Sequence, residues 1–249
     1  MAREVSARDR RLSLMRYVIP VGVSLSAERD FNRLLETIVF EAQKLCNADA
    51  GTLYLLAEDQ TLQFVIVRNT SLGITMGGTS GNVISFPSLR LYDPATGMPN
   101  HNNVATHSAL TGVRTNIPDA YHAEGFDFSG TKAFDARTGY RSTSFLTIPL
   151  KGDDQKVIGV LQLINAIEAG SGEIVAFAPD DVIESLVLLA YGALSAYIRE
   201  QSLRNEIEKL RIEIDAASQA REVAEITESD YFQQLQQKVR LLRGRESAR

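Results

Sequence analysis

Reactive and metal-binding residue types are scarce in this 249-residue sequence, which contains one cysteine, three histidines and no tryptophan. The single Cys46 cannot form an intramolecular disulfide or a cysteine-based metal cage. Such cysteine usage is typical of proteins from a reducing compartment. The sequence therefore predicts a cytoplasmic protein.

A positive net charge is also missing, because 26 Lys plus Arg stand against 31 Asp plus Glu, a formal net charge of -5. There is thus no overall basic field to hold a nucleic acid or an anionic membrane. The apolar run after Arg16 contains Pro20 and ends at Ser24, which is too short to cross a bilayer. We expect no nucleic-acid partner, no membrane span and no export signal.

Motifs of catalytic and cofactor sites are absent as well. The segment Gly77-Gly-Thr-Ser-Gly81 lacks the Gly-Lys-Ser/Thr of a phosphate-binding loop, and His101, His107 and His122 belong to no zinc-ligand motif. We therefore expect no enzyme activity, no cofactor and no metal site. A hydrolase that uses His107 or His122 with Asp119 stays an alternative, and it requires these side chains to converge.

The N-terminal third of the sequence predicts two helices. In the N-terminal segment, residues 1–27, helical spacing predicts a leader helix over 8–19 that Pro20 ends or kinks. A second helix, over 28–47 with Ser26 as its N-cap, carries an apolar stripe and has Cys46 at its end as a small buried residue. The stripe comprises Phe31, Leu34, Leu35, Ile38, Val39, Ala42 and Leu45.

Two pairs of strands follow in the sequence. Residues 52–56 and 62–67 form one predicted hairpin, and residues 144–148 and 157–164 form another, so we expect an antiparallel sheet. The stretch 73–141 between them is rich in Gly, Asn, Asp and Pro, with a short strand predicted near 83–86 and a helix around 104–110. Long excursions of this kind are usually binding loops or lids.

The C-terminal part is predicted to be helical. A helix over 180–200 leads into a coiled-coil segment over 201–226, and a short amphipathic helix with a basic tail is expected over 227–249. The coiled-coil seam is Leu203, Ile207, Leu210, Ile214 and Ala217, and the short helix carries Phe232, Leu235, Val239 and Leu242. Ile and Leu alternate in the seam as in parallel two-stranded coils, which predicts a homodimer. The alternative is a monomer whose helix 203–217 folds back on its own domain.

Aromatic, acidic and hydroxyl side chains alternate between Asn116 and Ser142. Rings can stack on a flat ligand while carboxylates and hydroxyls fix its polar edges, so this composition is typical of a small-molecule pocket. A self-packed loop in which Asp119 and Asp135 cap local turns explains the same composition. The residues alone leave both interpretations open.

Four segments in this order resemble the GAF domain family: Asn116-Ile-Pro-Asp-Ala-Tyr121, Phe134-Asp-x-x-Thr-Gly-Tyr-Arg-Ser142, Leu146-x-Ile-Pro-Leu150 and Val157-Ile-Gly-Val-Leu-Gln-Leu-Ile-Asn165. The resemblance is closest to the cyclic-nucleotide-type GAF domains of phosphodiesterases and bacterial adenylate cyclases, and it covers residues 28–200. It implies an α+β fold in which a central antiparallel sheet of about six strands has helices on one face and ligand loops on the other.

The resemblance also assigns ligand contacts to eight positions: Thr52, Arg68, Asn69, Ala109, Asp135, Thr138, Ser142 and Gln162. In family members that bind a cyclic nucleotide, a Phe-Asp pair stacks on the base and hydrogen-bonds it. Arg68-Asn69 stands at that place in this sequence, and Arg68 could stack on the base. Of the family's Asn-Lys-Phe-Asp-Glu signature, which is thought to brace the lid over the ligand, Asn165, Phe177 and the pair Asp180-Asp181 remain, with Ala166 at the place of the Lys. A longer segment, residues 86–103, replaces a short glycine-rich turn.

Together these features predict a non-enzymatic sensory or regulatory module that binds a small planar ligand, with a cyclic nucleotide as the candidate. No cyclase, phosphodiesterase or kinase follows in the printed sequence, so the signal is expected to pass through helical dimerisation or to a separate output protein. The alternative is an apo scaffold in which residues 86–103 fill the pocket and the helices bind partners.

Overall fold

The computed structural model describes residues 14–152, 154–178, 181–228 and 234. The chain divides into two compact units, Met1–Tyr197 and Ile198–Arg249. The first part of the predicted leader helix, the short amphipathic helix and the basic tail lie outside the described residues.

The first unit is built around one antiparallel sheet. Its strands, in the spatial order β3-β2-β1-β7-β6-β5, are β1 (Ala48–Leu56), β2 (Thr61–Asn69), β3 (Ile74–Gly77), β5 (Thr115–Ile117), β6 (Phe145–Lys151) and β7 (Val157–Ile167). Two short strands complete it, because β4 (Leu89–Arg90) pairs with β2 and β8 (Ile174–Val175) pairs with β7. The predicted α+β fold with its antiparallel sheet is confirmed.

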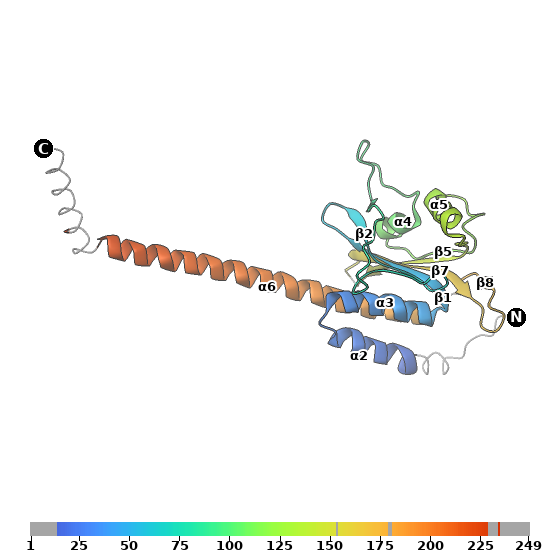
Figure 1. The fold of residues 1–249 in the computed structure, drawn as a ribbon, viewed down its shortest axis with the longest axis horizontal. Helices are drawn as coiled ribbons and strands as arrows, with labels where there is room; N and C mark the ends of the chain where they lie inside the picture. Colours follow the sequence, from blue (N-terminus) through green and yellow to red (C-terminus); the bar gives the residue numbers. More distant parts are fainter. Residues whose placement is uncertain (1–13, 153, 179–180, 229–233, 235–249) are drawn as a thin grey trace. The chain divides into compact units, whose positions relative to one another are not determined.

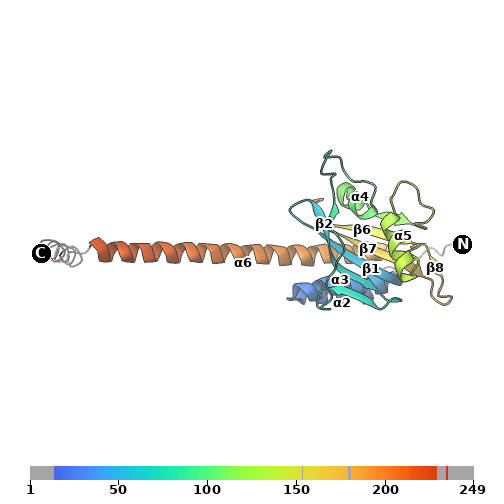
Figure 2. The same ribbon diagram turned by 45° about the horizontal axis from the view of Figure 1, so that its top comes forward.

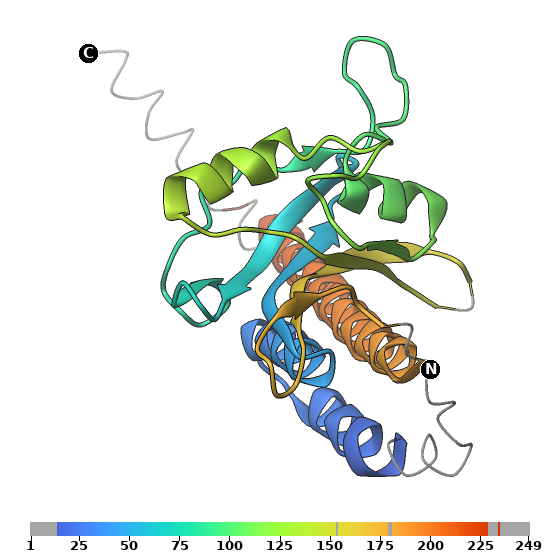
Figure 3. The same ribbon diagram turned by 90° about the vertical axis from the view of Figure 1, so that its right-hand side faces the viewer.

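Helices cover one face of this sheet (Figures 1 and 3). α3 (Phe31–Leu45) and the first turns of α6 (Asp181–Glu228) pack on the sheet, and α2 (Ile19–Ala27) lies outside α3. The apolar stripe of α3 enters the largest core cluster, where Ile38, Leu161 and Leu194 are fully buried. Burial of such side chains is worth roughly 1.5–3 kcal/mol each before entropy, so this layer supplies most of the folding free energy.

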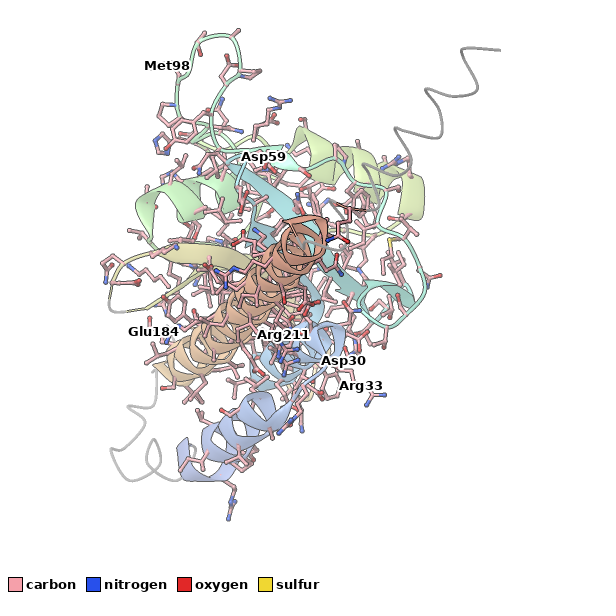
Figure 4. The ribbon with its side chains drawn as sticks, turned by 90° about the vertical axis from the view of Figure 1, so that its left-hand side faces the viewer. Asp30, Arg33, Asp59, Met98, Glu184 and Arg211 are labelled. Carbon is pink, nitrogen blue, oxygen red and sulfur yellow. The ribbon has the colours of Figure 1, made fainter. Side chains whose placement is uncertain are left out.

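Two predictions about the N-terminal helices are wrong in detail. Pro20 does not end a helix but lies in the first turn of α2, which follows a short π-helix, Leu14–Val18. The first turn tolerates proline because its missing N–H has no helical acceptor there. α3 is capped by Asp30, whose carboxylate accepts from Arg33 N, whereas Ser26 belongs to α2. Figure 4 shows Asp30 and Arg33 at the start of α3.

The other face of the sheet is covered by α4 (Val104–Thr111), α5 (Ser129–Thr138) and the insertion 86–103 (Figures 1 and 2). α4 was expected, but α5 was not, because Asp135 is its one buried residue and an apolar stripe is missing. The predicted strand near 83–86 is wrong, since residues 81–88 form no regular element. Gly77, Gly78 and Gly81 adopt positive φ and turn the chain away from the sheet after β3.

Residues 198–228, the described part of the second unit, form one helix that is the continuation of α6, with no break at residue 200. Four residues of the predicted coiled-coil seam are at least half exposed: Leu203, Ile207, Leu210 and Ile214. By length and composition alone, Val182–Gln219 could cross a membrane, but core helices pass the same test. Burial of Ile183, Leu186 and Ala190 in the core accounts for the apolar start of α6.

Candidate ligand-binding site

A cavity of about 280 Å³ lies between the sheet and the segments above it. Its floor comes from β1, β2, β6 and β7, and its walls come from residues 86–89, the starts of α4 and α5, and residues 140–142. This volume is close to the lower limit of about 300 Å³ for small-molecule pockets. The cavity therefore suits a compact ligand.

The floor carries a row of polar side chains across three strands. Thr52 on β1 pairs with Gln162 on β7, which in turn pairs with Thr147 on β6. The Gln162 amide is held at both ends, because its Nε2 donates to Thr147 Oγ1 at 3.0 Å and its Oε1 accepts from the Tyr54 hydroxyl at 3.2 Å. The row therefore presents a fixed amide to the cavity.

Thr52 is the member of this row on β1. It is 7% exposed and lines the cavity, but its hydroxyl is not a buried orphan, because the buried side-chain atom without a partner among the described residues is Gln43 Oε1 on α3. A hydroxyl on the floor of the cavity can bond a ligand there.

Aromatic rings line one side of the cavity. Tyr54 and Phe64 have ring centroids 4.6 Å apart, Phe86 follows at 5.4 Å from Phe64, and Phe134 lies 6.4 Å from Phe86. Burial raises the pKa of Tyr54, so its hydroxyl stays a neutral donor. Such a wall favours a flat, largely neutral group over a fully charged one.

Arg68 does not stack into this cavity. Its guanidinium lies over the Phe40 ring of α3, 4.8 Å from the ring centroid, on the opposite side of the sheet. A register shift in the β1–β2 pairing, opposite Leu53 and Tyr54, places one extra residue in β2 and inverts which side chains face the cavity beyond it. Arg68 thus lies opposite Gly51, where a Cβ would meet Val39 of α3. In this structure the guanidinium therefore faces α3, and the stacking of Arg68 on a base stays a prediction.

Asp135 does not face the cavity either. Its Oδ2 accepts from the Tyr121 hydroxyl and from Ser142 N, both at 2.8 Å, and its Oδ1 accepts from Ser142 Oγ at 2.8 Å. Thr138 is likewise engaged locally, with its hydroxyl donating to Phe134 O. The carboxylate braces the loop, as the self-packed interpretation requires.

Ala109 is the third assigned position that the structure places outside the cavity wall. It belongs to α4 and is buried in a small apolar cluster with Tyr54 and Val160. The structure gathers five of the eight assigned residues in the wall: Thr52, Arg68, Asn69, Ser142 and Gln162. Of these, Arg68 has its guanidinium over Phe40, whereas Asn69, Ser142 and Gln162 already bond other residues of the protein.

Comparison with known proteins identifies the family of this chain. The model of the GAF domain family matches residues 30–191, well over half of the chain. The chain belongs to the GAF domain family. GAF domains are generally regulatory modules that bind small ligands, which agrees with a cavity above the sheet.

Two curated relatives are phosphodiesterases. The dual 3',5'-cyclic-AMP and -GMP phosphodiesterase 11 of Drosophila melanogaster is 35% identical over 115 residues, which are 46% of this chain and 7% of that protein. The dual 3',5'-cyclic-AMP and -GMP phosphodiesterase 11A of Takifugu rubripes is 36% identical over 84 residues, 34% of this chain and 8% of that protein. The chain thus matches less than a tenth of the length of these relatives.

Solved structures share the fold at low identity. The GAF domain of a Coxiella burnetii phosphoenolpyruvate-protein phosphotransferase has a TM-score of 0.55 at 15% identity and covers 78% of this chain and 98% of that chain. The free methionine-R-sulfoxide reductase of Neisseria meningitidis has a TM-score of 0.52 at 13% identity and covers 79% of this chain and 97% of that chain. At such identities the likeness concerns the fold alone.

Several cavity residues of this GAF domain were not singled out from the sequence: Tyr54, Phe64, Phe86, Asn103, Asp127 and Tyr140. Alternation along β1 places Thr52 and Tyr54 on the same face, so Tyr54 was accessible to sequence reasoning. Phe86 and Asn103 bound the insertion, and their position beside the cavity depends on how that loop folds back.

One histidine of the alternative hydrolase site does converge with Asp119, because His122 Nδ1 lies 2.8 Å from Asp119 Oδ2. The pair lies in a largely exposed turn outside the cavity, in which Asp119 also accepts from Tyr121 N. His107 contacts His101 instead. Among the described residues no group of three or more His, Cys, Asp or Glu gathers as a metal site.

Proposed function

We propose that this GAF domain binds a small planar ligand in the cavity and acts as a non-enzymatic sensory or regulatory module. The observation that carries this proposal is the cavity itself, whose floor carries Thr52 paired with Gln162, an amide held in place by Thr147 and Tyr54. A planar ring against the wall of Phe64, Phe86 and Phe134 would bring polar ring edges to these two groups.

A purine cyclic nucleotide is the proposed ligand. The relatives named dual cyclic-AMP and -GMP phosphodiesterases support it, and a purine combines a flat π-face with hydrogen-bonding edges. Asn103 caps the start of α4 by accepting from Ala105 N and Thr106 N, so those amides are not open to a phosphate. Beside the cavity, Gly130 and Thr131 in the first turn of α5 offer the alternative for the anion.

The non-enzymatic character rests on where the reactive side chains lie. Cys46, the single thiol of the sequence, packs against the core cluster on the helix side of the sheet. None of the three histidines belongs to the cavity wall. This placement of the thiol and the imidazoles supports a non-enzymatic role for the cavity.

Signal output is proposed to use helices. The exposed seam from Leu203 to Ile214 would be buried by a second copy of the chain in a homodimer, and a separate output protein would then read the state of the helices in the cytoplasm. The competing scaffold hypothesis requires the insertion to fill the pocket. Phe86, Pro87 and Leu89 of the insertion line the wall and leave about 280 Å³ of open volume, which favours ligand binding.

Calorimetric titration with cyclic AMP, cyclic GMP and free purines tests this proposal. We expect saturable binding that Thr52→Val weakens, because the hydroxyl is lost while the shape is kept. Thr37→Val is the control, since Thr37 is a partly exposed residue of α3 on the other side of the sheet. An absence of binding at millimolar ligand to well-folded protein would remove the nucleotide proposal.

A further inference from the structure

Two histidines that are separate in the sequence meet beside the cavity. His101 Nδ1 lies 3.2 Å from His107 Nδ1, with ring centroids 5.2 Å apart and an interplanar angle of 69°. His107 is on α4, whereas His101 belongs to the insertion 86–103. The contact therefore joins a loop to a helix.

Both rings are held by their surroundings. The Phe126 ring packs edge-on against His107, with centroids 5.3 Å apart. On the insertion, Asn100 N donates to Leu91 O and Asn100 O accepts from the Thr106 hydroxyl at 2.6 Å. The backbone next to His101 is thus tied to α4, which keeps the two imidazoles in contact.

The spacing of the two nitrogens matches the bite of one metal ion. Imidazole nitrogens bind Zn²⁺ at about 2.0–2.1 Å, so two of them on a tetrahedral ion lie about 3.3 Å apart. The observed 3.2 Å agrees with that value. His101 is exposed, which gives an ion from solvent access to the pair.

We propose that His101 and His107 form a two-histidine site for a divalent transition-metal ion of the Zn²⁺ class, bound through both Nδ1 atoms. Imidazole suits Zn²⁺, Cu²⁺ and Ni²⁺, and water completes the coordination. The ion would fasten the insertion to α4. Because the insertion contributes Phe86 and Leu89 to the cavity wall, metal binding would stiffen that wall.

Calorimetry of the full chain, free of affinity tags, with ZnCl₂ tests the site at neutral pH. We expect one saturable Zn²⁺ site that His101→Ala and His107→Ala each weaken by at least about tenfold. His122→Ala is the matched control, because His122 is exposed and pairs with Asp119. Mg²⁺, which prefers oxygen ligands, should not bind there. Unchanged affinity in either variant, dependence on His122, or no saturable Zn²⁺ binding would overturn the proposal.

Nitrogen NMR of the histidine rings gives an independent readout. Zn²⁺ should shift the Nδ1 resonances of His101 and His107 and leave their Nε2 protonated, while His122 stays unchanged. Coordination through Nε2 contradicts the geometry. His101→Gln, which keeps a polar side chain at an exposed position, separates loss of metal binding from loss of folding, and neither experiment depends on the proposed purine ligand.

Discussion

The hydroxyl of Tyr140 donates a hydrogen bond of 2.6 Å to Asp49 Oδ2 and so ties the segment after α5 to the first strand of the sheet. The other carboxylate oxygen of Asp49 accepts from Ser71 N and Ser71 Oγ in the turn after β2. Tyr140 also lines the cavity. One buried carboxylate thus fixes two segments around the mouth of the binding site.

Tyr140→Phe should lower the free energy of unfolding by about 1–3 kcal/mol, because it removes a partner of the buried Asp49 and leaves the ring in place. Urea denaturation measures this change. Tyr92→Phe, at an exposed position of the insertion, is the control and should stay within about 0.5 kcal/mol of the wild type. Equal stability of both variants would show that the Tyr140–Asp49 contact contributes nothing.

Stability should also fall in strong base. Burial raises the pKa of Tyr54, and burial together with the hydrogen bond to Asp49 raises the pKa of Tyr140. The pKa of tyrosine in an unfolded chain is about 10. The stabilisation by these neutral hydroxyls is therefore fully present below that pH, and it is lost as the pH rises toward the higher pKa of the folded state. Urea midpoints measured from pH 8 to 11 should decline less in Tyr140→Phe than in the wild type.

Asp135→Ala should destabilise the domain by roughly 2–4 kcal/mol, because it removes the acceptor of three hydrogen bonds from Tyr121 and Ser142. Thr138→Ala should cost less than about 1 kcal/mol, since its hydroxyl makes one local bond. Thermal unfolding distinguishes the two. A stable Asp135→Ala protein that merely loses ligand would restore Asp135 as a direct ligand contact.

Arg68→Gln should leave ligand affinity within about twofold of the wild type, because the guanidinium lies on Phe40 across the sheet. Its effect on stability should be about 0.5–1 kcal/mol, the size of an exposed cation–π contact. Calorimetry and urea denaturation of the same preparation measure both. A large loss of affinity would mean that Arg68 turns into the cavity when a ligand binds.

Ile207→Asp should dissociate the expected homodimer, because it places a charge at a core position of the seam. Ile212→Asp is the matched control, since Ile212 is similarly exposed but lies outside the predicted seam. Sedimentation of the full chain at tens of micromolar compares them with the wild type. A wild-type monomer would support a helix that acts alone, and equal dissociation of both variants would argue against a specific seam.

Local periodicity explains why much of the fold could be predicted. Apolar residues recur every 3.6 residues in α3 and every two residues in the strands of the two hairpins, so the buried face of each element can be predicted from its own sequence. α5 lacked this signal because a carboxylate, Asp135, is what it buries. The cap of α3 was misplaced because Ser26 and Asp30 are both good caps, and packing of the preceding α2 decides between them.

The sequence by itself determined the antiparallel sheet and the helix layer on one face, whereas Thr52 and Gln162 were assigned only through the family resemblance. Only the tertiary structure decided which neighbours Arg68, Asp135 and His101 have. One extra residue in β2 reverses the faces of the strand beyond it and sends Arg68 to α3. A periodic pattern fixes which side of an element a residue takes, whereas its partner depends on how the loops fold and how distant segments pack. Loop folding places Asp135 against Ser142 and His101 against His107, and packing of distant segments places Tyr140 against Asp49.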